Sequence, residues 1–344
     1  MELSDEALAS VTTLLSGDRL AQFLALSGSL RPAVELHQQT LRVGGSLMCV
    51  IAVVEIALRN TISDYLTAHF GTADWPRHPR APFVWRDPEK TRIGGAIASA
   101  QRAAYAKLDT AAKHAIDARV FRKGVPTYLT HEQHAKIRQH SLTVPNSQVV
   151  AQLSLSFWKR LFSPEYESSL WRPVLKRIFP DKTLRRADVA VQLEHVYQAR
   201  NRIAHHEPVY GHRLRDTLAA IDFIVTRLEQ REPSRTTPLS QLLVGEWPAL
   251  STQADKLRAR IDACASAQSP CAFDQAVRFD DAKSARAMLL PVAAINHDLP
   301  WRRSRPDGRR DGSVDPCIRT ASATGCERND VQRADPVHER PPCA

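Results

Sequence analysis

The chain has 344 residues, of which 43% are hydrophobic and 24% are charged. These proportions are typical of soluble globular proteins and exclude a chain too polar to bury a core. Lys and Arg number 47 against 37 Asp and Glu, which gives a formal net charge of +10 and favours a polyanionic partner such as nucleic acid. Part of this charge belongs to the basic run from Trp301 to Arg310, so the excess is not by itself decisive.

The sequence gives little support for a membrane or secreted protein. Residues 1–5 are acidic rather than basic and do not resemble a secretory signal. The most apolar stretch, 47–58, is about 12 residues long and contains Glu55, whereas a membrane span needs roughly 20 apolar residues. Cys49 lies inside this stretch, and the other cysteines follow residue 263 without the spacing of a zinc site. We therefore expect a cytoplasmic protein without membrane contact, metal ion or other cofactor.

The composition predicts an all-α fold, because only 13 glycines are present and helical periodicities outnumber alternating ones. Residues 5–69 are interpreted as successive helices, the longest of which begins near residue 34 or 46 and is ended by Gly71. The prolines between Trp75 and Pro82 then predict a loop. The helices expected after this loop cover residues 88–108, short segments within 109–147, and then 147–162, 166–179, 184–205 and 211–230.

These elements are grouped into a main helical domain over residues 1–235 and a small helical appendage over 236–265. From residue 266 onward the helical pattern decays, and towards the end Arg, Asp, Pro, Gly and Ser dominate. Such a segment cannot bury enough apolar surface to offset the entropy of its chain. We therefore expect 266–344 to be a largely disordered basic tail.

The densest group of reactive side chains lies at the C-terminal end of the expected helix 184–205. It consists of Arg200, Asn201, His205 and His206. Arg200 and His205 are five positions apart, so an unbroken helix would direct their side chains about 140° apart. They converge only if the helix ends or turns near His205. Pro208 supplies a reason for this, because the residue before a proline avoids the helical conformation.

These residue types together suit the cleavage of RNA. A guanidinium offers a planar fork of donors to a phosphate, a histidine exchanges protons near neutral pH, and Asn201 can orient either group. The 2′-hydroxyl of RNA is a built-in nucleophile, so neither a metal ion nor a protein nucleophile is required. The structural alternative is helix capping, because cations at a helix C-terminus are mildly stabilising without any reaction.

The segment Arg200-Asn201-Arg202-Ile203-Ala204-His205 resembles the motif of the HEPN superfamily, in which an arginine and a polar residue are followed by a histidine. Its continuation, His206-Glu207-Pro208-Val209-Tyr210, resembles the Abi-like (abortive infection) branch of bacterial phage-defence proteins. Three further segments, 55–62, 157–162 and 171–180, resemble core segments of the same branch. The resemblance extends over residues 20–230.

The resemblance implies a HEPN-like helical bundle with additional helices. Members usually pair as homodimers in which two Arg/His motifs face one another across a basic cleft. It also implies a metal-independent endoribonuclease, in which Arg200 grips the scissile phosphate, His205 acts as base or acid and Asn201 supports them; His206 also falls within the allowed spacing. RNA would be the substrate of a phage-defence protein or toxin, with an antitoxin or regulatory protein as a further partner.

Two other functions stay open. The chain could be a catalytically inactive HEPN-type module that binds RNA or a nucleotide. Alternatively, it could be a helical protein-interaction component of a defence or toxin–antitoxin system, whose histidines merely cap a helix.

Three further residues are weaker candidates for lining a cleft beside Arg200. Glu55 and Arg59 are four positions apart on one helix face, where a half-buried ion pair is the more ordinary interpretation. Tyr210 could stack on a base, although aromatic residues near a helix start belong more often to the core.

Overall fold

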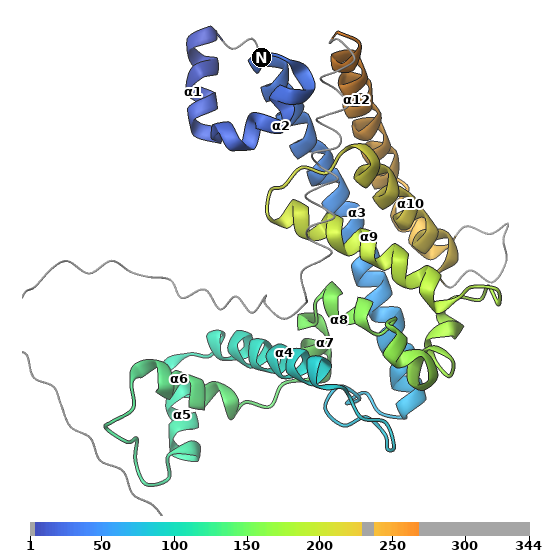
Figure 1. The fold of residues 1–344 in the computed structure, drawn as a ribbon. Helices are drawn as coiled ribbons and strands as arrows, with labels where there is room; N and C mark the ends of the chain where they lie inside the picture. The colour runs from blue at the N-terminus through green and yellow to red at the C-terminus, as the bar shows by residue number, and fades with distance from the viewer. Residues whose placement is uncertain (1–3, 229–236, 268–344) are drawn as a thin grey trace, which may run out of the picture. The chain divides into compact units, whose positions relative to one another are not determined.

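The computed structural model describes residues 4–228 and 237–267. Over these residues the chain forms helices joined by turns, without a β-strand, so the all-α prediction is confirmed. The helix α3 (Leu30–Phe70) runs through the middle of Figure 1, and most of the other helices pack against it. The position of each functional side chain therefore depends on how its helix packs on α3.

The N-terminal helices α1 (Asp5–Leu15) and α2 (Gly17–Ser27) precede α3, and both contact it. α3 begins at Leu30, before either of the expected starts, and continues through Gly44 and Gly45. A glycine inside a helix costs up to about 1 kcal/mol relative to alanine, but burial of neighbouring apolar side chains outweighs this. The helix ends as predicted at Gly71, whose φ of 68° lies in the left-handed region that glycine tolerates.

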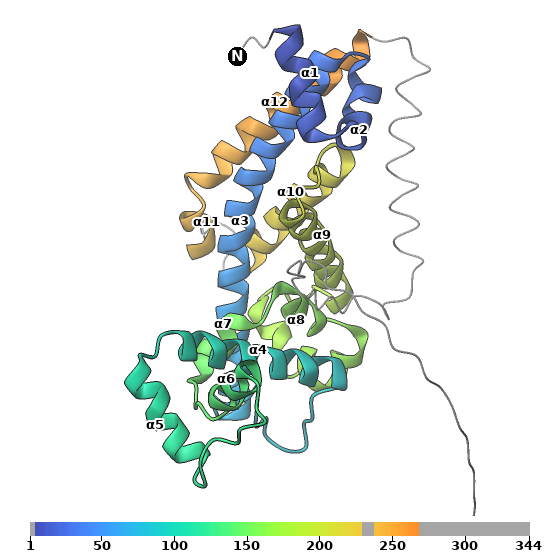
Figure 2. The same cartoon turned by 90° about the vertical axis from the view of Figure 1, so that its left-hand side faces the viewer.

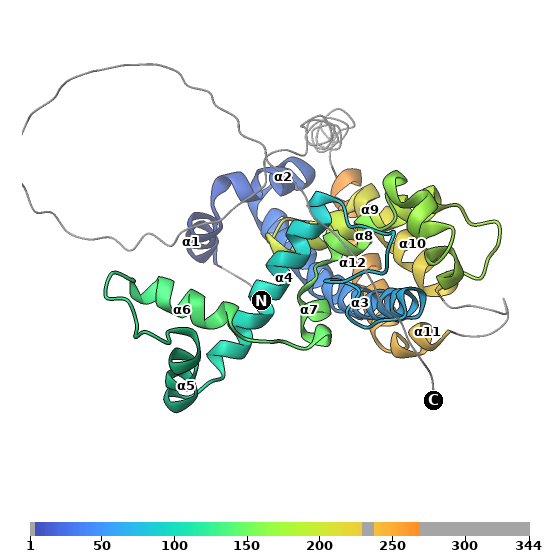
Figure 3. The ribbon, with the colours of Figure 1, turned by 90° about the horizontal axis from the view of Figure 1, so that it is seen from below.

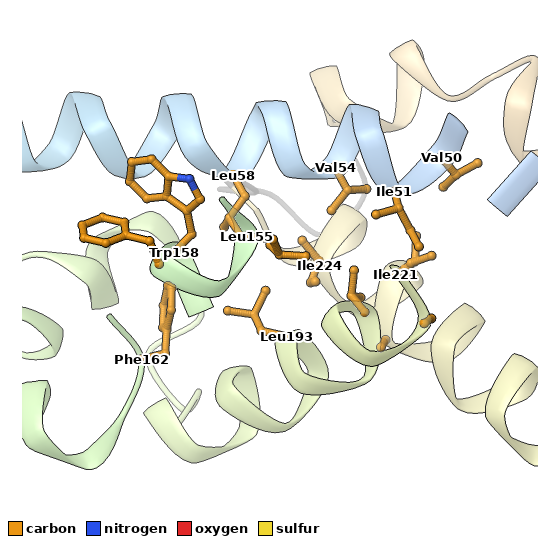
Figure 4. Close-up of a cluster of buried hydrophobic side chains, with 14 of the residues drawn as sticks. Val50, Ile51, Val54, Leu58, Leu155, Trp158, Phe162, Leu193, Ile221 and Ile224 are labelled. Carbon is orange, nitrogen blue, oxygen red and sulfur yellow. The ribbon is translucent and has the colours of Figure 1, made fainter. Parts of the chain in front are cut away.

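The core lies between α3 and the helices α8 (Leu155–Arg160), α9 (Arg186–Ala204) and α10 (Gly211–Arg227). Figure 4 shows Ile51, Val54 and Leu58 of α3 directed toward side chains of these three helices, with Val50 beside them on the same helix. These four residues are at most 2% exposed, and each buried aliphatic side chain contributes roughly 1.5–3 kcal/mol. The 3.6-residue periodicity of this stripe thus fixes α9, which carries the Arg/His motif, against α3.

α3 is also long and apolar enough to cross a membrane by length and composition, with a mean hydropathy of 2.0 over 18 residues. The apolar stretch is thus longer than the 47–58 interval recognised in the sequence. The core helix of a soluble protein passes the same test, and 39% of this window of α3 is buried. Its other side leaves Leu41 and Ile56 about half exposed.

A second group of helices is formed by α4 (Asp87–Ala106), α5 (Thr110–Val120) and α6 (His131–His140), close to the predicted positions. Figure 3 shows α5 and α6 side by side near α4. Asp117 joins them, because it accepts a 2.6 Å hydrogen bond from Arg138 Nε and lies 2.8 Å from His134 Nε2. The Arg138 guanidinium is the main cause that lowers the pKa of Asp117 to about 2.

The first turn of α4 is held by a buried carboxylate. Glu89 is fully buried, forms an ion pair with Arg160 of α8, and accepts a 2.7 Å hydrogen bond from Tyr166 Oη. Around it, the loop before α4 contributes Trp75 and Trp85 to an aromatic cluster. The predicted Pro-rich loop is therefore present but is partly a core element.

Two of the helix predictions were wrong in detail. The segment 147–162 contains two helices, α7 (Asn146–Gln152) and α8, because Leu153 is extended and its carbonyl accepts a 3.1 Å hydrogen bond from Trp158 Nε1. The segment 166–179 is not one α-helix. It consists of short turns η1 (Pro164–Tyr166), η2 (Glu167–Trp171) and η3 (Leu175–Ile178), and Pro173 cannot donate the backbone hydrogen bond that would join the last two.

The last described helices, α11 (Pro238–Leu242) and α12 (Glu246–Ser266), follow α10. Figure 2 shows α12 alongside α3, and α12 also contacts α2. Its buried Leu250 and Leu257 join the main core, while Gln39 of α3 donates a 2.9 Å hydrogen bond to Gln253. The expected appendage 236–265 thus packs on the main helical domain. Apart from its first two residues, the expected tail 266–344 lies outside the described residues.

Candidate functional site

The end of α9 is closed by its own backbone. The amide of His206 donates to the carbonyl of Ile203 at 2.9 Å, and the amide of Glu207 donates to that of Arg202 at 2.7 Å. This pair of bonds defines the Schellman motif, in which the residue after the cap adopts the left-handed conformation. His206 occupies that position with a φ of 57°, where glycine is the usual residue. The carbonyls are therefore satisfied without help from an imidazole.

α9 ends at Ala204, and the chain takes the left-handed turn only at His206, after the cap residue His205. His205 has φ −96° and ψ 13°, and its amide still donates to the carbonyl of Asn201 at 3.1 Å. By helix geometry, Arg200 and His205 therefore leave α9 about 140° apart, and one chain does not bring them together. Arg202, three positions before His205, shares its side of the helix instead.

The side chains of the four predicted site residues have no polar partner within the fold. Within residues 4–228 and 237–267, the side chains of Arg200, Asn201, His205 and His206 form no hydrogen bond or ion pair. Both histidines are exposed, whereas Arg200 and Asn201 are half-buried. These side chains are thus available to a ligand or to a second protein.

Arg202 and Arg19 hold the turn that carries the histidines. The guanidinium of Arg202 lies 3.1 Å from Glu207 Oε2 and donates to the carbonyl of Pro208 at 3.3 Å. Arg19 of α2 donates to the carbonyl of His206 at 2.6 Å. The turn is therefore anchored at both ends, and α2 helps to position it.

Tyr210 belongs to the same contact between the turn and α2. Its hydroxyl lies 3.4 Å from Gln22 Oε1, and its ring centroid is 6.0 Å from that of Phe23. This environment favours the packing interpretation of Tyr210 over base stacking. Behind Phe23 lies His37 of α3, which is 4% exposed and whose Nδ1 has no partner among the described residues. Burial, followed by the charge of Arg19, lowers the pKa of His37.

Glu55 and Arg59 lie away from the end of α9. α3 meets the end of α9 at Gly44, where a Cβ atom would be 3.6 Å from Ile203 Cγ2. Glu55 lies roughly 16 Å further along α3 by helix rise, and Arg59 lies further still. Both side chains are half-buried, and no ion pair joins them in the described part of the chain. Arg59 Nε instead donates to Asn60 Oδ1 at 3.1 Å.

A hollow between α9 and α10, next to the motif, was not predicted from the sequence. Its volume is about 210 Å³, and it is lined by polar side chains from both helices. These are His195, Gln198 and Arg202 of α9 with His212, Arg213 and Asp216 of α10. The signal available in the sequence was the spacing of His195, Gln198 and Arg202, which places three polar residues on one helix face.

No protein-family model, curated protein or solved structure matches the chain. Among the described residues, His, Cys, Asp and Glu side chains form no group of three that could hold a metal ion. Any functional interpretation therefore depends on the sequence resemblance and on the arrangement around the end of α9.

Proposed function

We propose that this protein is an RNA-binding, metal-independent endoribonuclease whose reactive groups lie at the C-terminal end of α9. The observation that carries the proposal is that His205 and His206 are exposed while the backbone closes the helix end. If capping were the reason for these histidines, their imidazoles would bond to the last carbonyls, but the amides of residues 205–207 already occupy those acceptors.

The proposed reaction uses groups of this chain and of RNA. A neutral imidazole accepts the proton of a ribose 2′-hydroxyl as the 2′-oxygen bonds to the adjacent phosphorus. The bond from phosphorus to the 5′-oxygen breaks, and that oxygen takes a proton from a protonated imidazole. The products are a 2′,3′-cyclic phosphate and a free 5′-hydroxyl. A guanidinium of Arg200 or Arg202 neutralises the phosphate oxygens, and Asn201 holds the phosphate or the imidazole.

The charge around the turn supports a polyanionic ligand. Arg19 and Arg202 hold the turn, and Arg200, His205 and His206 remain without partners among the described residues. The guanidiniums of Arg19, Arg200 and Arg202 outnumber the carboxylate of Glu207 in this turn. Such an excess of cations attracts a phosphate backbone and releases its counterions, so we expect the affinity for RNA to fall as salt is raised.

The separation of Arg200 and His205 favours a second candidate function, RNA binding without cleavage. A pair of groups about 140° apart around α9 cannot both contact one phosphate unless the helix end rearranges or a second chain contributes. In a binding module, Arg200→Gln would weaken RNA binding, whereas His205→Ala would leave it nearly unchanged.

If two copies of the chain paired, Arg200 of one copy could lie close to His205 of the other. We propose a homodimer in which His205 of one copy and Arg200 of the other act on the same phosphate. The half-exposed Leu41 and Ile56 on the outer side of α3 provide apolar surface for such a contact. Light scattering would measure the mass in solution. In the dimer, a mixture of Arg200→Gln and His205→Ala chains should regain part of the activity that each variant loses alone.

The deciding experiment incubates the purified full-length protein with total RNA in excess chelator, and analyses the RNA ends. The wild type should produce 2′,3′-cyclic ends, and His205→Ala should not. His131→Ala is the matched control, because His131 is an exposed histidine on α6, remote in sequence from the motif. RNA binding by every variant is measured in parallel.

The outcomes separate the candidate functions. Cleavage by the wild type and His131→Ala, but not by His205→Ala, supports the endoribonuclease. Binding without cleavage in all variants contradicts it and supports the binding module. A role in phage defence or as a toxin predicts growth arrest on expression in bacteria, relieved by His205→Ala.

A further inference from the structure

The hollow between α9 and α10 lies on the side of α9 that carries Arg202. Arg202 lines the hollow and precedes His205 by three positions, so the two side chains are neighbours on the helix surface. Arg200 lies on another side of α9. A ligand in the hollow would thus extend toward His205.

The chemistry of the lining suits a nucleotide. Apolar contact comes from Ala199 and Val209, and the carboxylate of Asp216 and the amide of Gln198 provide hydrogen-bonding groups. The Gln198 amide also donates to Glu194 Oε1 at 3.0 Å, which leaves its oxygen and one N–H for a ligand. Arg202 adds a cation at the end nearer His205. A volume of about 210 Å³ is smaller than the roughly 300–1,000 Å³ of common ligand pockets, so it suits a single planar base and not a folded peptide element.

Asp216 gives the hollow a distinctive acceptor. Its carboxylate is the only acidic group of the lining. Among the described residues its nearest ionic neighbour is Arg215, whose Nε lies 4.0 Å from Oδ1, beyond hydrogen-bond distance. The carboxylate therefore keeps acceptor capacity for a ligand that presents donors.

We propose that this hollow binds one unpaired nucleotide of RNA and prefers guanine. The choice of RNA as ligand rests on the proposed function. A carboxylate accepts two parallel hydrogen bonds from neighbouring donors, and the Watson–Crick edge of guanine presents two, the ring N1–H and the exocyclic N2–H₂. Adenine and cytosine pair a single donor group with an acceptor on that edge, and uracil places an acceptor on either side of its donor. Gln198 can bond the remaining polar groups of the base.

The test uses RNA heptamers that cannot be cleaved because every 2′-hydroxyl is replaced by fluorine. They carry uracil throughout except for a central guanine, hypoxanthine, adenine or cytosine. Binding to the full-length protein is measured by fluorescence anisotropy. The guanine heptamer should bind about tenfold more tightly than the adenine heptamer, because one bidentate base contact discriminates by at least this order. Hypoxanthine, which lacks the N2 amino group, should lie between them.

The variant Asp216→Asn tests the carboxylate, and Asp222→Asn is its matched control. Asp222 is an exposed residue of α10 that does not line the hollow. Asp216→Asn should reduce the preference for guanine below twofold, whereas Asp222→Asn should retain it. Thermal unfolding of both variants checks that they fold. Competition with guanosine and adenosine 5′-monophosphates distinguishes RNA from a free nucleotide as the ligand.

Equal affinity of the wild type for all four heptamers, or a preference that survives Asp216→Asn, would overturn the inference. If guanosine monophosphate competed as well as the heptamer, the ligand would be a free nucleotide and the assignment to RNA would be wrong. Because the ligands are uncleavable, the result does not depend on catalysis. A guanine preference without cleavage of natural RNA contradicts only the endoribonuclease, and cleavage without a preference contradicts only the nucleotide site.

Discussion

Replacement of His206 by glycine should stabilise the protein while it removes an imidazole from the candidate site. His206 has a φ of 57°, and a residue with a Cβ atom pays roughly 1–2 kcal/mol to adopt the left-handed conformation. Glycine removes this strain but adds entropy to the unfolded chain, worth about 0.4–1 kcal/mol. The imidazole makes no bond to the described residues, and Arg19 binds the carbonyl of His206, which glycine retains. The expected net gain is about 0.5–1 kcal/mol.

Two further substitutions provide reference values for the change in stability expected of His206→Gly. His206→Val should lower stability by about 1 kcal/mol or more, because a β-branched residue tolerates positive φ poorly. His205→Gly should also lower it, by about 0.5–1 kcal/mol, because the φ of −96° at His205 leaves no strain for glycine to relieve. Calorimetric melting would resolve the series, since about 1 kcal/mol shifts the melting temperature of a domain of this size by roughly 2–4 °C.

The order Gly, then His, then Val in melting temperature is the required result at position 206. If the glycine variant melted below the wild type, or if valine were neutral, the left-handed conformation would not be what ends α9. In the cleavage assay, His206→Gly then becomes an informative variant. It removes one imidazole without weakening the fold, so a loss of cleavage would assign His206 to the reaction, and retained cleavage would leave His205.

Three further predictions concern buried or paired charges. Asp117→Asn should cost about 2 kcal/mol at pH 7, because a pKa lowered from 3.8 to about 2 corresponds to that difference at 1.36 kcal/mol per unit. This contribution is complete above about pH 4 and disappears as pH falls toward 2, so in urea unfolding from pH 7 to 2 the difference in stability between the wild type and the variant should shrink toward zero. His37→Leu should be at least as stable as the wild type at pH 7.5. In the wild type, stability should decline as pH falls below 6.5, because His37 of the unfolded chain takes up a proton before the buried imidazole does. His37→Leu should lack this contribution to the decline, and melting temperatures at pH 7.5, 6 and 5 test it. Glu89→Ala should cost about 3–5 kcal/mol in chemical unfolding, because it leaves Arg160 without its buried partner, whereas the double replacement of Glu89 and Arg160 by methionine should recover much of that loss.

The sequence predicted correctly those helices that pack through an apolar stripe formed by their own residues. α10 was expected at 211–230 from an apolar stripe at helical spacing, and it occupies Gly211–Arg227. Five members of the stripe are buried and one, Leu218, is half-buried; the buried ones are Leu214, Ile221, Ile224, Val225 and Leu228. The end of α3 at Gly71 was also predicted, because a glycine after a long apolar helix meets the conformational need of its C-terminus. In both cases the decisive interaction lies within a few residues of the chain.

Predictions failed where a neighbouring side chain or a missing donor decided the structure. Apolar spacing over 147–162 fits one helix, but Trp158 reaches back to the carbonyl of Leu153 and stabilises a break. The segment 166–179 also has helical spacing, but Pro173 removes a backbone donor in its middle. The hollow between α9 and α10 could not be recognised locally, because its two walls meet only after both helices pack.

The direction in which His205 leaves the helix depends on which residue adopts the left-handed conformation, and that residue is His206. Pro208 was expected to turn the chain near His205, but a proline restricts only the residue before it, and that residue is Glu207. The turn itself is set by His206, whose carbonyl and amide are both held, by Arg19 and Ile203 respectively. The sequence contains both histidines but does not show which of them takes the left-handed position.

The side of α9 along which RNA binds determines whether Arg200 or Arg202 contacts the phosphate next to His205. A strand that crosses the end of α9, or that lies between two copies, can meet Arg200, whereas a strand anchored in the hollow passes Arg202 first. Arg202 also holds Glu207 and Pro208, so a loss of cleavage in Arg202→Gln counts only if its melting temperature is unchanged. Arg200 has no such structural partner among the described residues. A strong effect of Arg200→Gln on cleavage by a monomeric protein would therefore require the end of α9 to unwind when RNA binds. The same effect confined to a dimer would require only that His205 come from the second copy.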